Sequence, residues 1–193
     1  MMLTRENILE KFISENDNKF SFEELTNIPK INLRGNSSDR VFVTSVGNIL
    51  ETFVPTEPNT INYNNKLKII WLSPNEWLIE IYEIENFKKI FLNLKNSLNT
   101  QNTAITDITN SRTIIKLSGT HIYKILAKFM IIDLHKALIK NYSVAQTIFI
   151  KLPVLIIRNH NENEKESILL HVNRSHAPYI INLLIDGSKN IDF

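Results

Sequence analysis

The side chains that could carry chemistry are spread thinly along this sequence. Its histidines are His121, His135, His160, His171 and His176, and they form neither a His-x-x-x-His pair nor an HExxH motif. Stretches such as Asp133-Leu134-His135 are better interpreted as surface or hydrogen-bonded groups than as metal ligands. Ser118-Gly119 lacks the first glycine of a nucleophile elbow, since the stretch reads KLSGT. We therefore expect no catalytic residue, no metal site and no cofactor-binding residue in this chain.

Three arginines stand where an anion could bind. Arg34, Arg112 and Arg174 each lie beside the end of an expected strand. A guanidinium there could clamp a carboxylate or phosphate through two hydrogen bonds. Each could equally form an internal ion pair, for which the candidate carboxylates are Asp107, Glu76 and Asp133, and we favour this interpretation. Asp107 lies in an expected strand and would need such a partner if it were buried.

Both tryptophans of the chain fall in the segment KIIWLSPNEWLIEIY, on either side of Pro74 and Asn75. If those two residues form the turn of a hairpin, Leu72 faces Trp77. Trp71 and Trp77 are then expected on opposite faces of the sheet, and a register shift of one residue would swap the two sets of side chains but still separate the tryptophans. One tryptophan would fill the core, and the other would be covered by helices of the same chain or by a partner, because tryptophan is a typical interface anchor. We treat Arg34, Trp71, Trp77, Asp107, Arg112 and Arg174 as the candidate structural or interface residues.

Composition excludes several classes of protein. The chain has 193 residues and a net charge of +2, with basic and acidic residues intermixed, so a nucleic-acid partner is not expected. It contains no cysteine, which excludes disulfides and thiolate metal sites. The first residues lack the apolar core of a secretory signal, and no apolar run approaches the ~20 residues that span a bilayer. We expect a cytoplasmic protein without membrane contact.

The hydrophobic pattern alternates between strand and helix periods. Strands are expected at 28–35, 67–72, 76–82, 103–109, 112–119, 145–152, 154–159 and 167–173. Helices are expected at 5–26, 37–51, 85–99, 120–130 and 175–187, and 54–65 is expected to be a loop. From residue 28 the order is β-α-β-β-α-β, a split βαβ or ferredoxin-like unit, and it then nearly repeats. This predicts an α+β fold of two ferredoxin-like units, pseudo-duplicated in one compact domain over 28–188, with a polar helical extension at 1–27 and a tail at 189–193.

Several short sequence motifs occur together, in an order and at a spacing that resemble one protein family. They are LRG (33–35), VPTEPNT (54–60), WLSPNEWLIE (71–80), DITNSRTIIKLSG (107–119), DLH (133–135), AQT (145–147) and NRSHAPYIINLLIDGS (173–188). This series resembles the gamma subunit of heterotetrameric sarcosine oxidase, within the superfamily of the aminomethyltransferase T-protein and its folate-binding relatives. Ser73 stands where the family usually has glycine, and His176 where an aromatic residue is common.

The resemblance implies a non-catalytic structural or assembly subunit. The complex oxidatively demethylates sarcosine to glycine, with hydrogen peroxide and either formaldehyde or methylenetetrahydrofolate as products. The resemblance further implies that alpha, beta and delta subunits are the partners of this chain. It implies that FAD, FMN, NAD, zinc and tetrahydrofolate are bound by those subunits. The alternative is a stand-alone folate-binding or one-carbon transfer protein, with Asp107 or Glu76 holding the pteridine. An RNA-modification accessory is disfavoured by the near-neutral charge.

Overall fold

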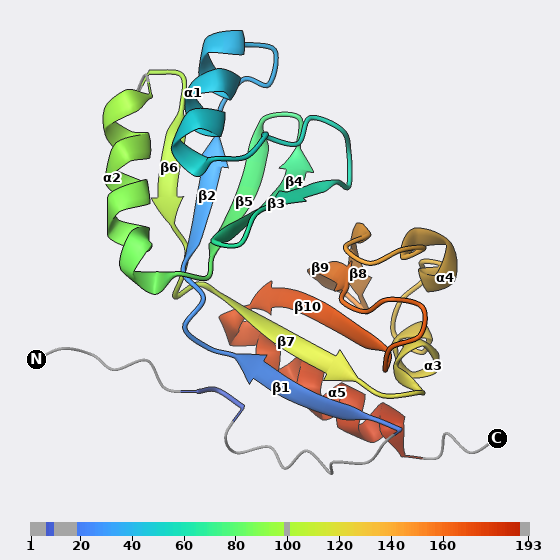
Figure 1. Ribbon diagram of the computed structural model, residues 1–193. Coiled ribbons are helices and arrows are strands. Elements are labelled where there is room, and N and C mark those ends of the chain that lie inside the picture. Colours follow the sequence, from blue (N-terminus) through green and yellow to red (C-terminus); the bar gives the residue numbers. More distant parts are fainter. Residues whose placement is uncertain (1–6, 10–18, 99–100, 190–193) are drawn as a thin grey trace, which may run out of the picture. The chain divides into compact units, whose positions relative to one another are not determined.

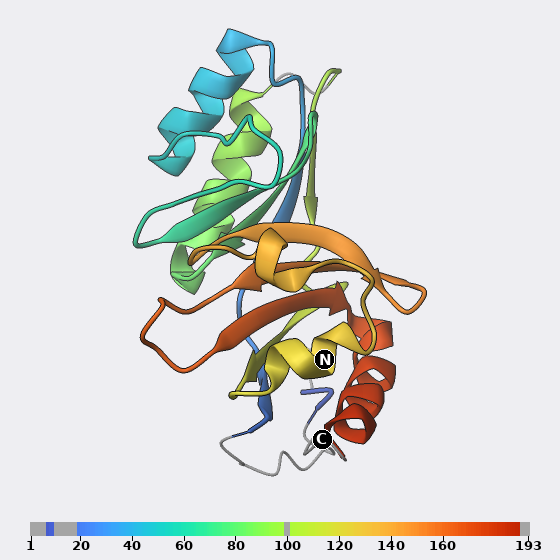
Figure 2. The same cartoon turned by 90° about the vertical axis from the view of Figure 1, so that its right-hand side faces the viewer.

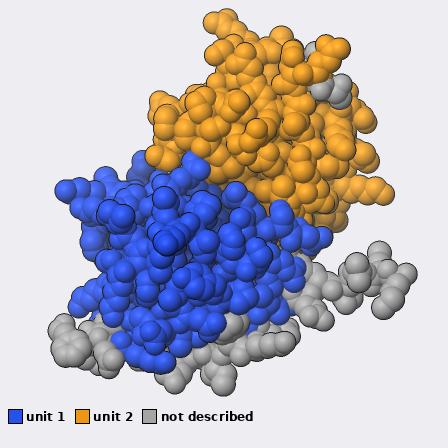
Figure 3. All heavy atoms as spheres, turned by 180° about the vertical axis from the view of Figure 1, so that it is seen from behind, with its two compact units in different colours: residues 1–26, 110–193 blue, residues 27–109 orange. Residues whose placement is uncertain are grey.

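The computed structural model describes residues 7–9, 19–98 and 101–189. The chain divides into two compact units, coloured separately in Figure 3: unit 1 holds residues 1–26 and 110–193, and unit 2 holds residues 27–109. Each unit has its own sheet and its own cluster of buried apolar side chains. The expected α+β class is confirmed, whereas the expected single compact domain is replaced by two units.

Unit 2 is a five-stranded antiparallel sheet with strand order β3-β4-β5-β2-β6 (Figure 1). Its strands are β2 (Lys30–Arg34), β3 (Ile61–Tyr63), β4 (Leu67–Ser73), β5 (Glu76–Ile81) and β6 (Ala104–Asp107). Its helices are α1 (Arg40–Leu50), the 3-10 turn η1 (Ile84–Asn86) and α2 (Phe87–Ser97). Without the short edge strand β3, which lies in the expected loop, this is the split βαβ order that the sequence predicted.

Unit 1 is also a five-stranded antiparallel sheet, with strand order β1-β7-β10-β9-β8 (Figures 1 and 2). Its strands are β1 (Ser21–Leu25), β7 (Arg112–Ser118), β8 (Val144–Phe149), β9 (Leu152–Arg158) and β10 (Ser167–Asn173). Its helices are α3 (Ile122–Ala127), α4 (Leu134–Ala137), the 3-10 turn η2 (Arg174–His176) and α5 (Ala177–Ser188).

The two sheets follow one plan. Written from the opposite edge, unit 2 reads β6-β2-β5-β4-β3, and unit 1 reads β1-β7-β10-β9-β8. In each unit a helix follows the second strand of this series, and another helix follows the third. The units differ in the source of the first strand: β6 follows α2 in the chain, whereas β1 comes from the N-terminal segment. The pseudo-duplication is therefore real, and its second copy is completed from the other end of the chain.

The helix expected over 5–26 is wrong at its C-terminal end. Ser21–Leu25 forms β1, which pairs with β7 so that Phe22 lies opposite Leu117. Phe22 is buried in the apolar cluster of unit 1, and burial of this side chain on the sheet outweighs the weak helical pattern. Residues 5–6 and 10–18 of the expected helix lie outside the described residues.

Helix α1 shows how local sequence sets the geometry of unit 2. Asp39 is its N-cap and accepts hydrogen bonds from the amides of Val41 (2.9 Å) and Phe42 (3.4 Å). The helix thereby directs Phe42 into the core, where its ring lies over Gly35. A Cβ atom built on Gly35 would lie 2.3 Å from this ring, so only glycine fits there.

Replacement of Gly35 by alanine should therefore lower the free energy of unfolding by about 1–3 kcal/mol, the usual cost of overpacking a core. Gly47→Ala is the matched control, because a Cβ at Gly47 meets its nearest neighbour at 3.4 Å and alanine favours the helix. Urea denaturation of both variants measures the difference. Equal stability of the two variants would contradict the close packing of Gly35 against Phe42.

Candidate functional site

Trp71 and Trp77 lie directly opposite one another on neighbouring strands. The register shifts between Trp71 and Ser73, so Leu72 is the extra residue of a β-bulge. Ser73 still pairs with Glu76 around the expected Pro74-Asn75 turn. The bulge shifts the pairing of β4 with β5 by one residue, so that Trp71, and not Leu72, lies opposite Trp77. Residues directly opposite one another on neighbouring strands project from the same face of the sheet. The expectation that the tryptophans lie on opposite faces is therefore wrong.

Trp77 lies at the centre of the apolar cluster of unit 2. It is fully buried, its ring lies 5.6 Å from that of Phe42, and its indole N–H donates a 2.7 Å hydrogen bond to the carbonyl of Pro55. The bond ties the loop after α1 to the middle of the sheet. The words LRG, VPTEPNT and EWL thus meet in one packed contact.

Trp71 packs against the same cluster but is only partly buried. Its indole nitrogen is shielded from solvent and has no hydrogen-bond acceptor among the described residues. A buried N–H without a partner is costly, so the two neighbouring indoles differ sharply in how well their polar atoms are satisfied.

The opposite face of the unit 2 sheet holds a row of buried charges that the sequence analysis did not find. Glu80 on β5 lies between Lys68 on β4 and Lys30 on β2 in the strand register. Lys30 and Glu80 are fully buried and Lys68 is nearly so. In the sequence these residues resemble the solvent-facing charges of ordinary strands, since Lys30 begins β2 and Lys68 is the second residue of β4, so only the strand register reveals the row.

Burial changes the acidity of this row. It raises the pKa of Glu80, against a smaller opposing effect of Lys68 and Lys30 and a hydrogen bond from Tyr82. Burial likewise lowers the pKa of Lys68, and the attraction of Glu80 opposes this shift. In both groups desolvation of the charge outweighs its attraction to its neighbour.

Arg34 forms the internal ion pair expected from the sequence. Its guanidinium lies 2.9 Å from a carboxylate oxygen of Glu76, which also accepts a hydrogen bond from Asn32. The Arg34 side chain is 56% exposed, so the pair is worth at most about 1 kcal/mol. Glu76 is thereby engaged by its neighbours on β2.

The remaining candidates lie apart from this pair. Asp107 is exposed at the end of edge strand β6, and its carboxylate accepts the amide of Thr109 (2.9 Å). In unit 1, Arg112 lies opposite Asn173, and the Arg174 amide donates to the carbonyl of Ser111. An ion pair for Arg112 or Arg174 stays a prediction.

His135 and His160 take part in local packing. His135 stacks on Tyr123, with ring centroids 4.8 Å apart, and the buried His160 places Nδ1 2.9 Å from the carbonyl of Ser167. Burial raises the pKa of Tyr123. Within residues 7–9, 19–98 and 101–189 no three His, Asp or Glu side chains are grouped as metal ligands.

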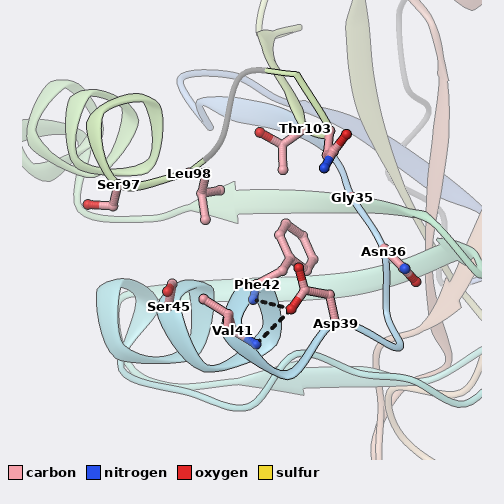
Figure 4. A pocket seen from close by; sticks show the side chains of 10 residues that line it. Gly35, Asn36, Asp39, Val41, Phe42, Ser45, Ser97, Leu98 and Thr103 are labelled. Carbon is pink, nitrogen blue, oxygen red and sulfur yellow. Dashed lines mark hydrogen bonds between the residues drawn. The ribbon is translucent and has the colours of Figure 1, made fainter.

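A pocket of about 570 Å³ lies beside the start of α1 and the end of α2 (Figure 4). Asp39 and Ser45 on one side, and Ser97 and Thr103 on the other, supply polar groups. The Asp39 carboxylate is already bonded to the first amides of α1. The described lining residues include no Lys, Arg or His beside the Asp39 carboxylate.

Comparison with known proteins places this fold. The sarcosine oxidase, gamma subunit family matches residues 34–190, most of the chain. The chain belongs to this family. Its membership confirms the resemblance carried by the sequence words, and those words fall on the contacts described above: Gly35 under Phe42, Pro55 under Trp77, and the Trp71–Trp77 pair.

Solved structures agree on the fold. The chain is similar to heterotetrameric sarcosine oxidase from Corynebacterium sp. U-96 in complex with pyrrole 2-carboxylate, with a TM-score of 0.76 at 17% identity over 90% of this chain and 86% of that chain. It also resembles the glycine cleavage system aminomethyltransferase T from Bartonella henselae, with a TM-score of 0.60 at 12% identity over 87% of this chain and 46% of that one. A comparison with curated protein sequences gives no match. None of the described helices is both long and apolar enough to cross a membrane.

The two tryptophans provide a matched test of the packed contact. Trp77→Phe should lower the free energy of unfolding by about 1–3 kcal/mol more than Trp71→Phe, because only Trp77 donates a buried hydrogen bond whose acceptor would be left unpaired. Chemical denaturation followed by far-UV circular dichroism measures both variants. A cost for Trp71→Phe equal to that for Trp77→Phe would refute the assigned difference.

The buried charge row predicts a pH dependence. Because the folded-state pKa of Glu80 is raised, the unfolded chain ionises first, and the contribution of Glu80 to stability falls as pH rises above its ordinary value of 4.5. Glu80→Gln removes this loss, so the stability of the variant relative to the parent should increase with pH over that window. Lys68→Met should show the opposite trend. Because the folded-state pKa of Lys68 is lowered, the cost of burying its charge disappears as pH rises toward 10.5, so the parent gains stability relative to the variant. Urea denaturation across pH gives both slopes, and a difference independent of pH would contradict the burial of these charges.

Proposed function

We propose that this chain is a non-catalytic, structural subunit of a heterotetrameric sarcosine oxidase. The complex would demethylate sarcosine oxidatively to glycine, with hydrogen peroxide and formaldehyde or methylenetetrahydrofolate as products. The observation that carries the proposal is the family match over residues 34–190, to which the fold similarity adds support.

The arrangement of polar side chains supports the structural role. Glu76 holds Arg34 and Asn32, Asp39 caps α1, and Asp133 caps α4 while pairing with Lys136. Each of these carboxylates is occupied by a contact that shapes the fold. Proton transfer would need a carboxylate or histidine directed at a substrate.

The proposal assigns the cofactors to the other subunits. The alpha, beta and delta chains would hold FAD, FMN, NAD, zinc and tetrahydrofolate, and this chain would hold none. The residue types in this chain agree with this assignment of the cofactors to other subunits. The chain has no cysteine and only four glycines, none of them in a dinucleotide-binding or P-loop pattern.

A stand-alone folate-binding role is less well supported. The residues expected to hold a pteridine were Glu76 and Asp107. Glu76 is engaged by Arg34 and Asn32, and Asp107 is exposed at a sheet edge. The chain also matches only 46% of the aminomethyltransferase T chain.

Co-expression of the tagged chain with the genes of the alpha, beta and delta subunits tests the proposal. We expect all four chains to copurify, with flavin absorbance and sarcosine-dependent peroxide, and the chain alone to show neither. Arg34→Gln should leave the rate of the complex within about twofold, since exposed ion pairs contribute little. A chain that purifies alone despite co-expression, or that oxidises sarcosine by itself, would refute the proposal, and saturable tetrahydrofolate binding by the isolated chain would favour the alternative.

A further inference from the structure

Three isoleucines lie together on the surface of unit 1. Met130 and Phe149 form an antiparallel bridge, and the Ile150 amide donates to the carbonyl of Phe129, so residues 129–131 run beside residues 148–150. Next to the bridge, Ile131 and Ile148 are neighbours, with 102% and 55% of their surface exposed, and Ile150 is 44% exposed. We call these three residues the isoleucine patch.

The backbone at Ile150 makes its exposure more informative. It has a φ of 58° in the turn between β8 and β9. A β-branched side chain is strongly disfavoured there, and glycine or asparagine would be accommodated more easily. Such strain costs on the order of 1–3 kcal/mol, and strained residues cluster at functional positions. Neither backbone preference nor solvent favours isoleucine at this position.

A basic border accompanies the patch. Residues 120–160 contain five lysines, one arginine and a single acid, Asp133, whereas the whole chain has a net charge of only +2. Lys128 and Lys151 are exposed: Lys128 directly precedes residues 129–131, and Lys151 directly follows residues 148–150. Asp133 is held by α4 and Lys136. Lys128 and Lys151 therefore place two positive charges in the chain directly beside the segments that hold the isoleucines, and among the described residues the Lys128 ammonium donates only to the neutral carbonyl of Gly187.

We propose that the isoleucine patch is a docking surface for another subunit of the oxidase, one that presents an apolar centre bordered by carboxylates. The inference rests on the proposed function and names the surface that it requires. An apolar centre supplies affinity, and complementary charge at the border supplies orientation and association rate. A second copy of this chain fits poorly, because a two-fold contact would bring basic border against basic border.

Two variants separate docking from folding. Ile131→Asp/Ile148→Asp places charge in the patch at exposed positions, and Phe53→Asp in unit 2, at a residue 86% exposed, is the matched control. Ile150→Asn relieves the backbone strain while removing the apolar side chain. In the four-gene co-expression, we expect the double variant to recover about tenfold less of the partner subunits than the parent, and the control to recover the parental amount. Ile150→Asn should raise the thermal unfolding midpoint of the chain and still reduce partner recovery, which misfolding could not produce.

The outcomes distinguish this inference from the function on which it rests. If the parent chain recovers no partner subunits, the proposed function fails and the docking surface with it. If the parent and all three patch substitutions recover them equally, the subunit assignment stands and the docking surface is refuted. A third experiment measures binding of the parent chain and of the double variant to vesicles that contain anionic phospholipid. If the parent binds, the double variant does not, and subunit recovery is unchanged, the patch contacts a membrane surface instead.

Discussion

The hydrogen bond from the Trp77 indole to the Pro55 carbonyl organises unit 2. It joins the centre of the sheet to the loop after α1, a loop whose composition gives it no periodic structure of its own. The ring of Phe42 completes the contact and can approach only because residue 35 is glycine. The bulge at Leu72 belongs to the same arrangement, since it turns Trp71 onto the face that Trp77 occupies. A shift of one residue in β4 would remove Trp71 from the cluster and place Lys68 in the apolar core.

Polar side chains also stabilise the arrangement of unit 2 by hydrogen bonding to backbone groups of its loops. Asn64 illustrates the pattern: its side-chain amide donates to the carbonyl of Leu50, and its oxygen accepts from the amides of Lys66 and Leu67. Such bonds satisfy backbone groups at the end of α1 and at the start of β4, which would otherwise lie unpaired in partly buried surroundings. The polar side chains of Asn64 and Asp39 thus fix the loops and the helix end that frame the buried cluster of unit 2.

The sequence predicted most elements, because their hydrophobic periods are strong and their ends are marked by residues such as Asp39 and Pro74. For Arg34, at a strand end, it favoured an internal ion pair with Glu76 among three candidate carboxylates, and the structure has Arg34 paired with Glu76. It failed where the outcome depends on tertiary contact. The Leu72 bulge adds one residue to a strand without any local signal, and this alone reversed the expected placement of Trp71. Lys68 and Glu80 look like solvent-facing charges until the strand register places them together on a buried face.

The N-terminal segment shows the same limit on a larger scale. The sequence around β1 is polar and matched no family word, so it was interpreted as an extension, yet β1 occupies the edge position that β6 holds in unit 2. Glu24 on this strand accepts hydrogen bonds from the amides of Ile8 and Leu9 and from the hydroxyl of Thr113 on β7. Leu9 is buried in the apolar cluster. A duplicated unit needs its edge strand wherever in the chain that strand is encoded, and a search for repeats along the sequence cannot find a strand that lies ahead of both copies.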